Sequence, residues 1–354
     1  MEKKKNGEIE LFRFIFAMII VIFHFNIKFS LNMFYWGRLG VEFFFIVTGV
    51  LFAMSIKRID IDRKKIHIYT WSIIKRKILS FLPYYIMALL FNEICLNILI
   101  HHNTFNGIIK NFIKAIPRLL FFDCFGFRTN SNFQLGVDWY FSAMISAIFI
   151  LLPILLYNYE FVSKLICPLL SIIGLGFCFL KFGTACATTD LKNTFIDPLL
   201  IRGISNISLG VCGYEFALYI KESKLTNLSK TLLTLLKWIC LILTIIFAYR
   251  DIYKIYSLAP IILIFVAVIL SFSNITYNIP YNAITKFFGK LSLPIFLTHY
   301  TIRNILANTI GSNMEKWGIW TVIILCPVFA YVFMVFTDLI FAQLKKIKPL
   351  FIKE

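Results

Sequence analysis

Arg13 and His24 stand in the first long apolar run of the sequence, 11 residues apart. On an α-helix that spacing amounts to three turns plus roughly 20°, so both side chains fall on one face. A guanidinium binds anionic groups, and a neutral imidazole can take a proton from a hydroxyl group. The pair predicts a catalytic site with His24 as the general base. From spacing alone a structural pair is equally open, with His24 bonded to a neighbouring helix and Arg13 reaching the lipid headgroups.

Other ionisable side chains also fall inside apolar runs. A charge at the centre of a bilayer costs about 2.5–3.5 kcal/mol on insertion scales, so such side chains are usually functional or paired within a helix bundle. They predict a polar interior to which several helices contribute. The residues are Glu42, Glu93, Arg202, Glu215, His299, Arg303 and Asp338. Glu42 can pair with Arg13 or with Arg202, and His299 can line the same cavity as His24.

The elements that must position these residues are membrane-spanning helices. Of the 354 residues, 59% are hydrophobic and 15% are charged, which is too apolar for an ordinary soluble domain. A bilayer core of about 30 Å takes about 20 apolar residues per helix, and the lengths of the apolar runs define about ten such helices. They are 9–29, 37–56, 78–100, 138–157, 164–182, 199–220, 231–249, 256–273, 288–306 and 317–343. The chain is predicted to be an all-α, polytopic integral membrane protein, with one membrane-embedded domain over residues 1–354 and no appended soluble domain.

The distribution of Lys and Arg predicts the orientation of these helices. With a cytoplasmic N-terminus, the cytoplasmic segments hold 21 Lys and Arg and the outside segments hold 8, in agreement with the positive-inside rule. Both termini are then cytoplasmic, and the predicted location is the cell (cytoplasmic) membrane. This bias also explains the formal net charge of +18. A nucleic-acid binder would gather its cations on a water-exposed domain, so we expect no nucleic-acid partner.

The outside loops and the cysteines carry three further expectations. Within the loop 101–137, residues 108–122 alternate apolar and basic side chains like a helix lying at the membrane interface, and can form a lid. No Cys pair has the CxxC spacing of a metal or redox site, so no metal is expected. Cys124 and Cys186 fall in outside loops, where a disulfide can form; the sequence leaves that pairing open.

Four segments of the chain resemble acyltransferase family 3, a group of ten-helix membrane proteins that mostly O-acylate extracytoplasmic glycans. Residues 11–24 (LFRFIFAMIIVIFH) resemble its Arg-x10-His signature, and residues 40–49 (GVEFFFIVTG) its Gly-Val-Asp/Glu block. Residues 139–143 (WYFSA) and 289–299 (GKLSLPIFLTH) resemble its middle-helix opening and its end motif. Residues 202–210 form a weaker fifth match. Because these segments span most of the chain, the resemblance is global.

The chain departs from the family pattern at the start of the third helix. The family often has Arg-x-x-Arg before a Pro, whereas Lys77 and Ser80 occupy those positions before Pro83, so the second positive charge is missing. Lys75, Arg76 and Lys77 still form a basic cluster. It can hold the phosphates of a CoA ester as point charges rather than as a bidentate fork, or it can consist of ordinary positive-inside anchors.

Further departures remove hydroxyl groups from the site region. Thr48 replaces the serine that the family usually has, and Leu293 and Phe296 replace two tyrosines. Roles of those hydroxyls are therefore not carried over.

The resemblance implies an acetyl-CoA-dependent O-acetyltransferase. Acetyl-CoA binds from the cytoplasm on the basic cluster and Arg13, and His24 deprotonates the acceptor hydroxyl or carries the acyl group transiently. Glu42 orients Arg13 or Arg202, and His299 lines the cavity, although a structural role for Glu42, Arg202 and His299 is as open as a direct one. The acceptor is an extracytoplasmic glycan or sugar, and the polysaccharide-synthesis machinery is a candidate partner.

Two other classes of function remain open at the level of the sequence. One is a transporter or flippase that moves a lipid-linked sugar through a similar polar cavity, with His24 as a proton relay. The other is a structural or partner-binding membrane subunit. Only the acyltransferase consumes acetyl-CoA.

Overall fold

The computed structural model describes residues 6–98, 100, 104–125, 135–186, 196–223, 225–250, 258–309 and 314–351, and these residues fold into helices without a strand. The helices are α1 (Gly7–Phe29), α2 (Leu39–Ile56), α3 (Ile66–Asn92), α4 (Phe105–Leu119), α5 (Asp138–Tyr157), α6 (Tyr159–Phe161), α7 (Cys167–Phe182), α8 (Pro198–Lys221), α9 (Asn227–Tyr249), α10 (Leu258–Ser273), α11 (Ala283–Thr309) and α12 (Met314–Phe351). Short 3-10 or π-helical elements are η1 (Arg63–Lys65), η2 (Glu93–Ile98), η3 (Asp123–Phe125) and η4 (Val162–Ile166). The all-α class is thereby confirmed.

Each of the ten predicted segments overlaps a described helix. Six helical segments are long and apolar enough to cross a membrane: Leu39–Ile56, Arg63–Leu96, Asp138–Tyr157, Tyr159–Phe182, Asn227–Tyr249 and Trp320–Leu344. Helix α10 is apolar but has 16 residues, and α1, α8 and α11 carry most of the buried polar groups of the site described below. The chain is thus a multi-pass membrane protein, while the total of ten spans and the cytoplasmic termini stay predictions.

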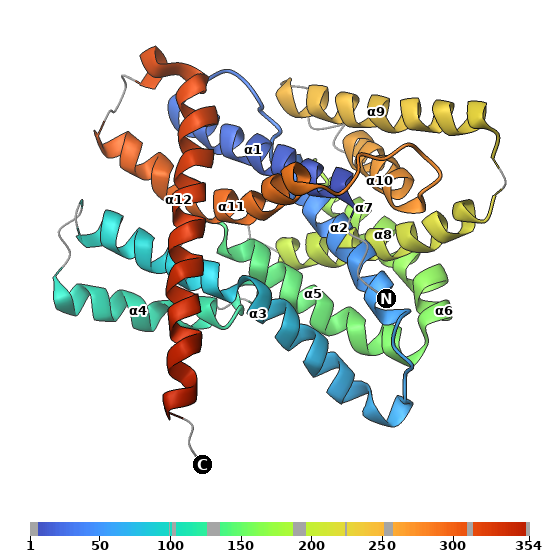
Figure 1. Ribbon diagram of the computed structural model, residues 1–354, viewed down its shortest axis with the longest axis horizontal. Helices are drawn as coiled ribbons and strands as arrows, with labels where there is room; N and C mark the ends of the chain where they lie inside the picture. The colour runs from blue at the N-terminus through green and yellow to red at the C-terminus, as the bar shows by residue number, and fades with distance from the viewer. Residues whose placement is uncertain are drawn as a thin grey trace.

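The helices pack around a centre formed by α1, α2, α8 and α11 (Figure 1). Helix α1 lies along α11, and α2 lies along α8, while α9 and α4 lie at opposite edges in this view. Helix α12 runs crosswise over α1, α11 and α3 and contacts all three. Segments from the two ends of the sequence therefore meet along the α1–α11 contact.

Two glycines set the contact between α2 and α8. A Cβ on Gly49 would collide with the carbonyl oxygen of Ile207, and a Cβ on Gly210 would collide with that of Ile46. The backbones approach each other as closely as small residues permit in membrane helix pairs. This contact fixes α8 against α2 and hence the relative positions of the polar residues on the two helices.

A buried ion pair holds the start of α1. The carboxylate of Glu8 lies 2.8 Å from Nζ of Lys237 on α9, and both side chains have no exposed area. Ser271 donates to Glu8 at 2.7 Å, and Lys237 donates to Asn278 at 2.7 Å. The side chain of Asn6 caps α1 by accepting from its first backbone amides. Helix α1 is thereby tied to α9, α10 and the segment after α10.

Helix α4 covers most of the segment 108–122 that is predicted to lie at the membrane interface, and a buried polar group fixes its end. Ile109, Phe112 and Ile116 are exposed on one face of α4, as an interfacial helix requires. Arg118 at its other face is buried and lies 3.2 Å from Asp123 and 4.0 Å from Asp138, where α5 begins. The end of α4 is thereby anchored to the start of α5.

Neither Cys124 nor Cys186 forms a disulfide in the described part of the chain; both thiols are buried and free of an S–S bond. Cys186 instead lies near enough to Glu42 for the carboxylate to affect the thiol electrostatically. Because burial and this carboxylate disfavour the thiolate, the pKa of Cys186 is raised.

Candidate active site

A cavity of about 460 Å³ lies where α1, α2, α3, α5 and α11 meet. Each of the segments 11–24, 40–49, 139–143 and 289–299 contributes to its lining. These segments carry the resemblance found in the sequence, and the fold brings all four of them to one place.

The cavity is strongly basic. Its lining includes four cations, Arg13, Lys77, Lys286 and Lys290, and one carboxylate, Glu10. With these charge states the lining carries three net positive charges, which suits a polyanionic ligand. Helix α11 supplies two of the four cations.

Glu10 is placed by the contact between α1 and α11. Arg13 Nη1 lies 2.9 Å from Oε2 of Glu10, one turn earlier on α1. A Cβ on Gly289 of α11 would collide with this carboxylate, so the glycine leaves room for it. The Glu10–Arg13 pair is partly exposed to the cavity, with exposed side-chain fractions of 17% and 32%, and an incoming anion can therefore compete for Arg13.

Three aromatic rings, which we call the aromatic neck, close the inner end of the cavity. The ring centroid of Phe296 lies 6.1 Å from that of Phe44 and 5.3 Å from that of Tyr140. Tyr140 and Thr48 both line the cavity. On its other side, Phe296 lies 6.0 Å from the ring of His299. The aromatic neck therefore separates the basic cavity from a histidine.

His24 and His299 face each other beyond the aromatic neck. Their ring centroids are 5.2 Å apart and their planes are inclined by 30°. His299 Nδ1 lies 2.8 Å from the carbonyl oxygen of Phe296. Because a carbonyl only accepts, Nδ1 carries the hydrogen and Nε2 keeps a lone pair. Nδ1 of His24 and Nε2 of His299 are buried and have no hydrogen-bond partner among the described residues, so both are available to a ligand.

Tyr300 and Arg303 extend the histidine pair away from the aromatic neck. The ring of Tyr300 lies 4.6 Å from that of His24 and packs against the backbone at Gly136, where a Cβ would collide with the ring. The guanidinium of Arg303 lies 4.0 Å above the Tyr300 ring and donates to Asn304 at 2.9 Å. A cation and an aromatic ring thus stand next to the imidazoles.

Glu42 pairs with Arg202 and not with Arg13. The carboxylate lies 2.5 Å from the Arg202 guanidinium, and both side chains are buried. Asn206 donates to the second carboxylate oxygen at 2.7 Å, and the guanidinium lies 5.1 Å from the ring centroid of Trp139. Both oxygens of the Glu42 carboxylate are thus occupied, by Arg202 and Asn206. These contacts link α2, α8 and α5, and Glu42 offers no open acceptor to the cavity.

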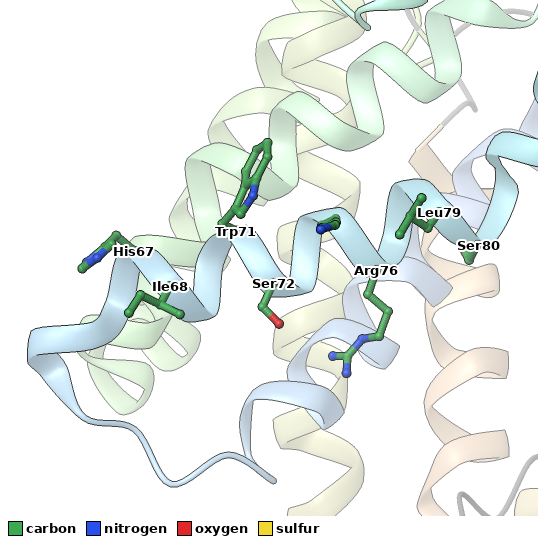
Figure 2. Close-up of a pocket in the computed structure, with 8 residues that line it drawn as sticks. His67, Ile68, Trp71, Ser72, Arg76, Leu79 and Ser80 are labelled. Atoms are coloured by element: carbon green, nitrogen blue, oxygen red, sulfur yellow. The ribbon is translucent and has the colours of Figure 1, made fainter. Parts of the chain in front are cut away.

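The basic cluster is divided between two surfaces. Lys77 lines the cavity together with Arg13, whereas Lys75 and Arg76 line an open groove on another face of α3. In Figure 2, Arg76 and Ser72 project from one side of α3 and Trp71 from the other. Successive helix residues point about 100° apart, so three consecutive cations cannot all face one cavity.

The remaining polar residues predicted inside the bundle have partners. Glu215 lies 2.8 Å from Nζ of Lys57 and accepts from Tyr159 at 2.7 Å. Asp338 of α12 accepts from Tyr84 of α3 at 2.6 Å. These contacts tie helices together, and Glu93 is buried at the start of η2. No group of three or more His, Cys, Asp or Glu side chains suited to a metal ion occurs among the described residues.

Sequence reasoning missed Glu10, Lys286 and Lys290 as parts of the site. Glu10 stands three residues before Arg13, and that spacing on a helix signals a pair. The two lysines are four residues apart on α11 and share a face, but nothing local indicates that this face meets α1. The buried pair of Glu8 and Lys237 was also missed, because each residue lies near the end of an apolar run.

A family model described as an acyltransferase domain matches residues 6–338 of the chain. No curated protein and no solved structure matches the chain.

Proposed function

The chain belongs to acyltransferase family 3, and from that membership we propose that it transfers an acetyl group from acetyl-CoA to a hydroxyl group of an extracytoplasmic glycan or sugar. The observation that carries the proposal is the arrangement of one basic cavity and one histidine pair along the same two helices. Arg13 and His24 both turn toward α11, where they meet Lys290 and His299. An acyl-CoA donor needs two such sites at different positions along the helices. One binds its anionic part, and the other lies where its acyl group reacts.

The basic cavity is proposed to bind the phosphates of the donor. A CoA ester carries several phosphate charges, and the cations Arg13, Lys77, Lys286 and Lys290 give the cavity net positive charge. Arg13 offers a bidentate fork, while the lysines act as point charges. Lys75 and Arg76 do not line this cavity, so the donor site that we propose includes Lys77 alone from the basic cluster. The positive-inside rule favours a cytoplasmic opening.

The acyl arm is proposed to pass the aromatic neck. The rise from Arg13 to His24 along α1 is about 16 Å at 1.5 Å per residue. The flexible arm that links the phosphates of a CoA ester to its thioester can cover that distance. Phe296 stands between the cavity and His299, so its side chain has to rotate for the thioester to reach the imidazoles.

His24 is proposed as the general base. The acceptor O–H gives its proton to an imidazole nitrogen of His24 as the oxygen attacks the acyl carbon. The C–S bond of the thioester then breaks, and the proton passes from His24 to the leaving thiolate. In the second route a nitrogen of His24 attacks the acyl carbon, the C–S bond breaks, and the N–H proton of the acyl-imidazolium passes to the leaving thiolate. The acceptor oxygen then attacks the acyl carbon, the N–C bond breaks, and the freed imidazole nitrogen takes the acceptor proton. In both routes His299 holds a fixed tautomer beside His24 and presents a lone pair on Nε2.

Arg202 and Glu42 are proposed to position the outer part of the site, with Trp139 held at the Arg202 guanidinium. The acceptor glycan would approach from the end of the bundle at which α1 ends, past Tyr300 and Arg303. A location in the cytoplasmic membrane, close to the polysaccharide-synthesis machinery, fits a reaction that takes its donor from the cytoplasm and its acceptor from outside.

The decisive experiment uses the purified protein in liposomes with radiolabelled acetyl-CoA and a panel of exported glycans. We expect acetyl-CoA to be consumed and label to appear on a glycan hydroxyl, and we expect neither with His24→Ala. Movement of a lipid-linked sugar across the bilayer without consumption of acetyl-CoA would instead establish a flippase. Absence of both activities, in protein that melts cooperatively, would point to a structural subunit.

A further inference from the structure

The groove on α3 is built from one face of the helix. Its lining residues recur every three or four positions, as the residues of one helical stripe do. Lys75 and Arg76 stand in the middle of the stripe. Trp71 comes before Arg76 along the helix and Leu79 after it (Figure 2). The cations are thus flanked along the helix by large apolar side chains.

This stripe faces away from the protein. The exposed fractions of Trp71, Leu79 and Ile68 are 62%, 55% and 53%, while the intervening Ile73 and Ile74 are buried against the bundle. The helix belongs to the candidate span Arg63–Leu96. In a membrane-spanning segment, an outward apolar face is covered by lipid. The exposed apolar stripe on this helix is therefore suited to contact with lipid at the membrane surface.

Among the described residues, the two cations in the groove have no counter-charge. Lys75 and Arg76 are exposed, and neither forms an ion pair or side-chain hydrogen bond with another described residue. Lys77, the next residue, differs in facing the basic cavity. Charged groups at a membrane surface are stabilised by anionic headgroups, and tryptophan prefers the same depth.

We propose that this groove is a binding site for the phosphate headgroup of an anionic phospholipid. The Arg76 guanidinium binds the phosphate through two parallel N–H···O bonds, and Lys75 adds a point charge. The Trp71 ring lies at the headgroup level, and Leu79 packs against the first part of an acyl chain. This inference is independent of the proposed enzymatic function, since it assigns Lys75 and Arg76 to the membrane and leaves Lys77 in the cavity.

The site predicts selectivity for lipid charge. Purified protein in detergent micelles would be mixed with phosphatidylglycerol or phosphatidylcholine, and bound lipid would be counted by native mass spectrometry. Wild type should retain the anionic lipid in preference. Because each Lys or Arg near an anionic surface strengthens binding about fivefold, the variant Lys75→Gln with Arg76→Gln should bind phosphatidylglycerol about thirtyfold more weakly, with phosphatidylcholine binding unchanged.

Two comparison variants make the test specific. Lys221→Gln with Lys230→Gln removes two other cations, on α8 and α9, and should retain phosphatidylglycerol like wild type. Lys75→Arg with Arg76→Lys keeps both charges and should also bind, which separates lost charge from damaged folding. Quenching of tryptophan fluorescence by brominated phosphatidylglycerol should fall when Trp71 is replaced by Phe.

Two results would overturn the proposal. One is unchanged lipid selectivity in the doubly neutralised variant. The other is unchanged lipid binding together with an affinity for acetyl-CoA, measured in lipid-free detergent, that falls about tenfold, because Lys75 and Arg76 would then hold the soluble donor. Loss of acetyl-CoA binding in a Lys290→Gln variant that keeps its lipid would bear on the donor cavity alone.

Discussion

The imidazole of His299 stands 5.2 Å from that of His24 and is held by a 2.8 Å hydrogen bond from its Nδ1 to the carbonyl oxygen of Phe296. The second ring nitrogen of His299 has no hydrogen-bond partner among the described residues, and neither has Nδ1 of His24. A buried polar atom without a partner is costly, so two of them side by side mark a place where a ligand supplies the missing contacts. Both histidines therefore belong in the first tests.

Replacing His24 by Ala should abolish acyl transfer. General acid–base catalysis contributes about 10²–10⁴-fold, and the rate should fall at least that far, while the level of the protein in the membrane stays normal. The measurement is transfer of labelled acetyl groups in liposomes. Transfer at the wild-type rate by a well-folded variant would exclude His24 as base and as acyl carrier.

His24 and His299 should act as a unit. Residues that share one chemical step show strongly non-additive kinetics. We therefore expect the double variant His24→Ala with His299→Ala to be no slower than His24→Ala alone. Rates of all four proteins of this cycle provide the measurement. Losses that multiply would mean that His299 contributes separately, for example by binding the acceptor.

Glu10→Gln should tighten donor binding. The carboxylate lies in the cavity proposed for an anionic ester and occupies Arg13 at 2.9 Å. Glu10 and the anionic donor repel each other, and removing that repulsion in a partly solvated site strengthens donor binding by about 1 kcal/mol. The KM for acetyl-CoA should therefore fall about fivefold, and kcat should change little. Lys290→Gln should raise KM by a similar factor, and both effects should shrink at high salt. A higher KM in Glu10→Gln would instead show that Glu10 positions Arg13 for the donor.

Gly49→Ala should destabilise the protein. Its Cβ would meet the carbonyl oxygen of Ile207, so α2 and α8 would have to separate, at a cost of about 1–3 kcal/mol. Gly176→Ala is the matched control, because a Cβ there meets no atom within 4 Å. Thermal melting in detergent measures both. Equal melting temperatures for the two variants would contradict the close crossing of α2 and α8.

Glu42→Gln should be more damaging than the loss of an exposed pair. It leaves the buried guanidinium of Arg202 without its counter-charge, which typically costs about 3–5 kcal/mol. Glu160→Gln, which removes the exposed partner of Lys164, should cost almost nothing. Replacing Glu42 and Arg202 together by Met should recover part of the loss. Chemical unfolding in mixed micelles gives the comparison, and similar losses for Glu42→Gln and Glu160→Gln would argue against a buried pair.

The helices followed from the sequence because apolar run length reflects the membrane directly. The segment 138–157 coincides with α5, and 199–220 differs from α8 by one residue at each end. Helix α3 begins at Ile66, before the predicted span 78–100, whose bounds stay a prediction. The helix extends through its basic residues because Lys and Arg are good helix formers and can reach from the helix to water.

The site followed from the sequence only in part. Arg13, His24 and His299 were found because polar groups in an apolar run are conspicuous. The sequence does not decide whether Glu42 pairs with Arg13 or with Arg202, because that choice depends on how α2 packs against α8. Contacts across helices from distant parts of the chain leave no local pattern. The division of the basic cluster was likewise invisible until the face of α3 that meets the bundle was known.

The buried ion pair of Glu8 and Lys237 also has a consequence for biosynthesis. Helix α1 leaves the ribosome first, yet the ammonium, hydroxyl and amide groups that neutralise Glu8 lie between residues 237 and 279. During most of translation the carboxylate of Glu8, at the start of α1, therefore lacks the groups that neutralise it in the folded protein. We therefore expect α1 to pack into the bundle late, after α9 and α10 have been synthesised. In chains that are truncated before α9, α1 should stay unpacked and accessible to membrane proteases.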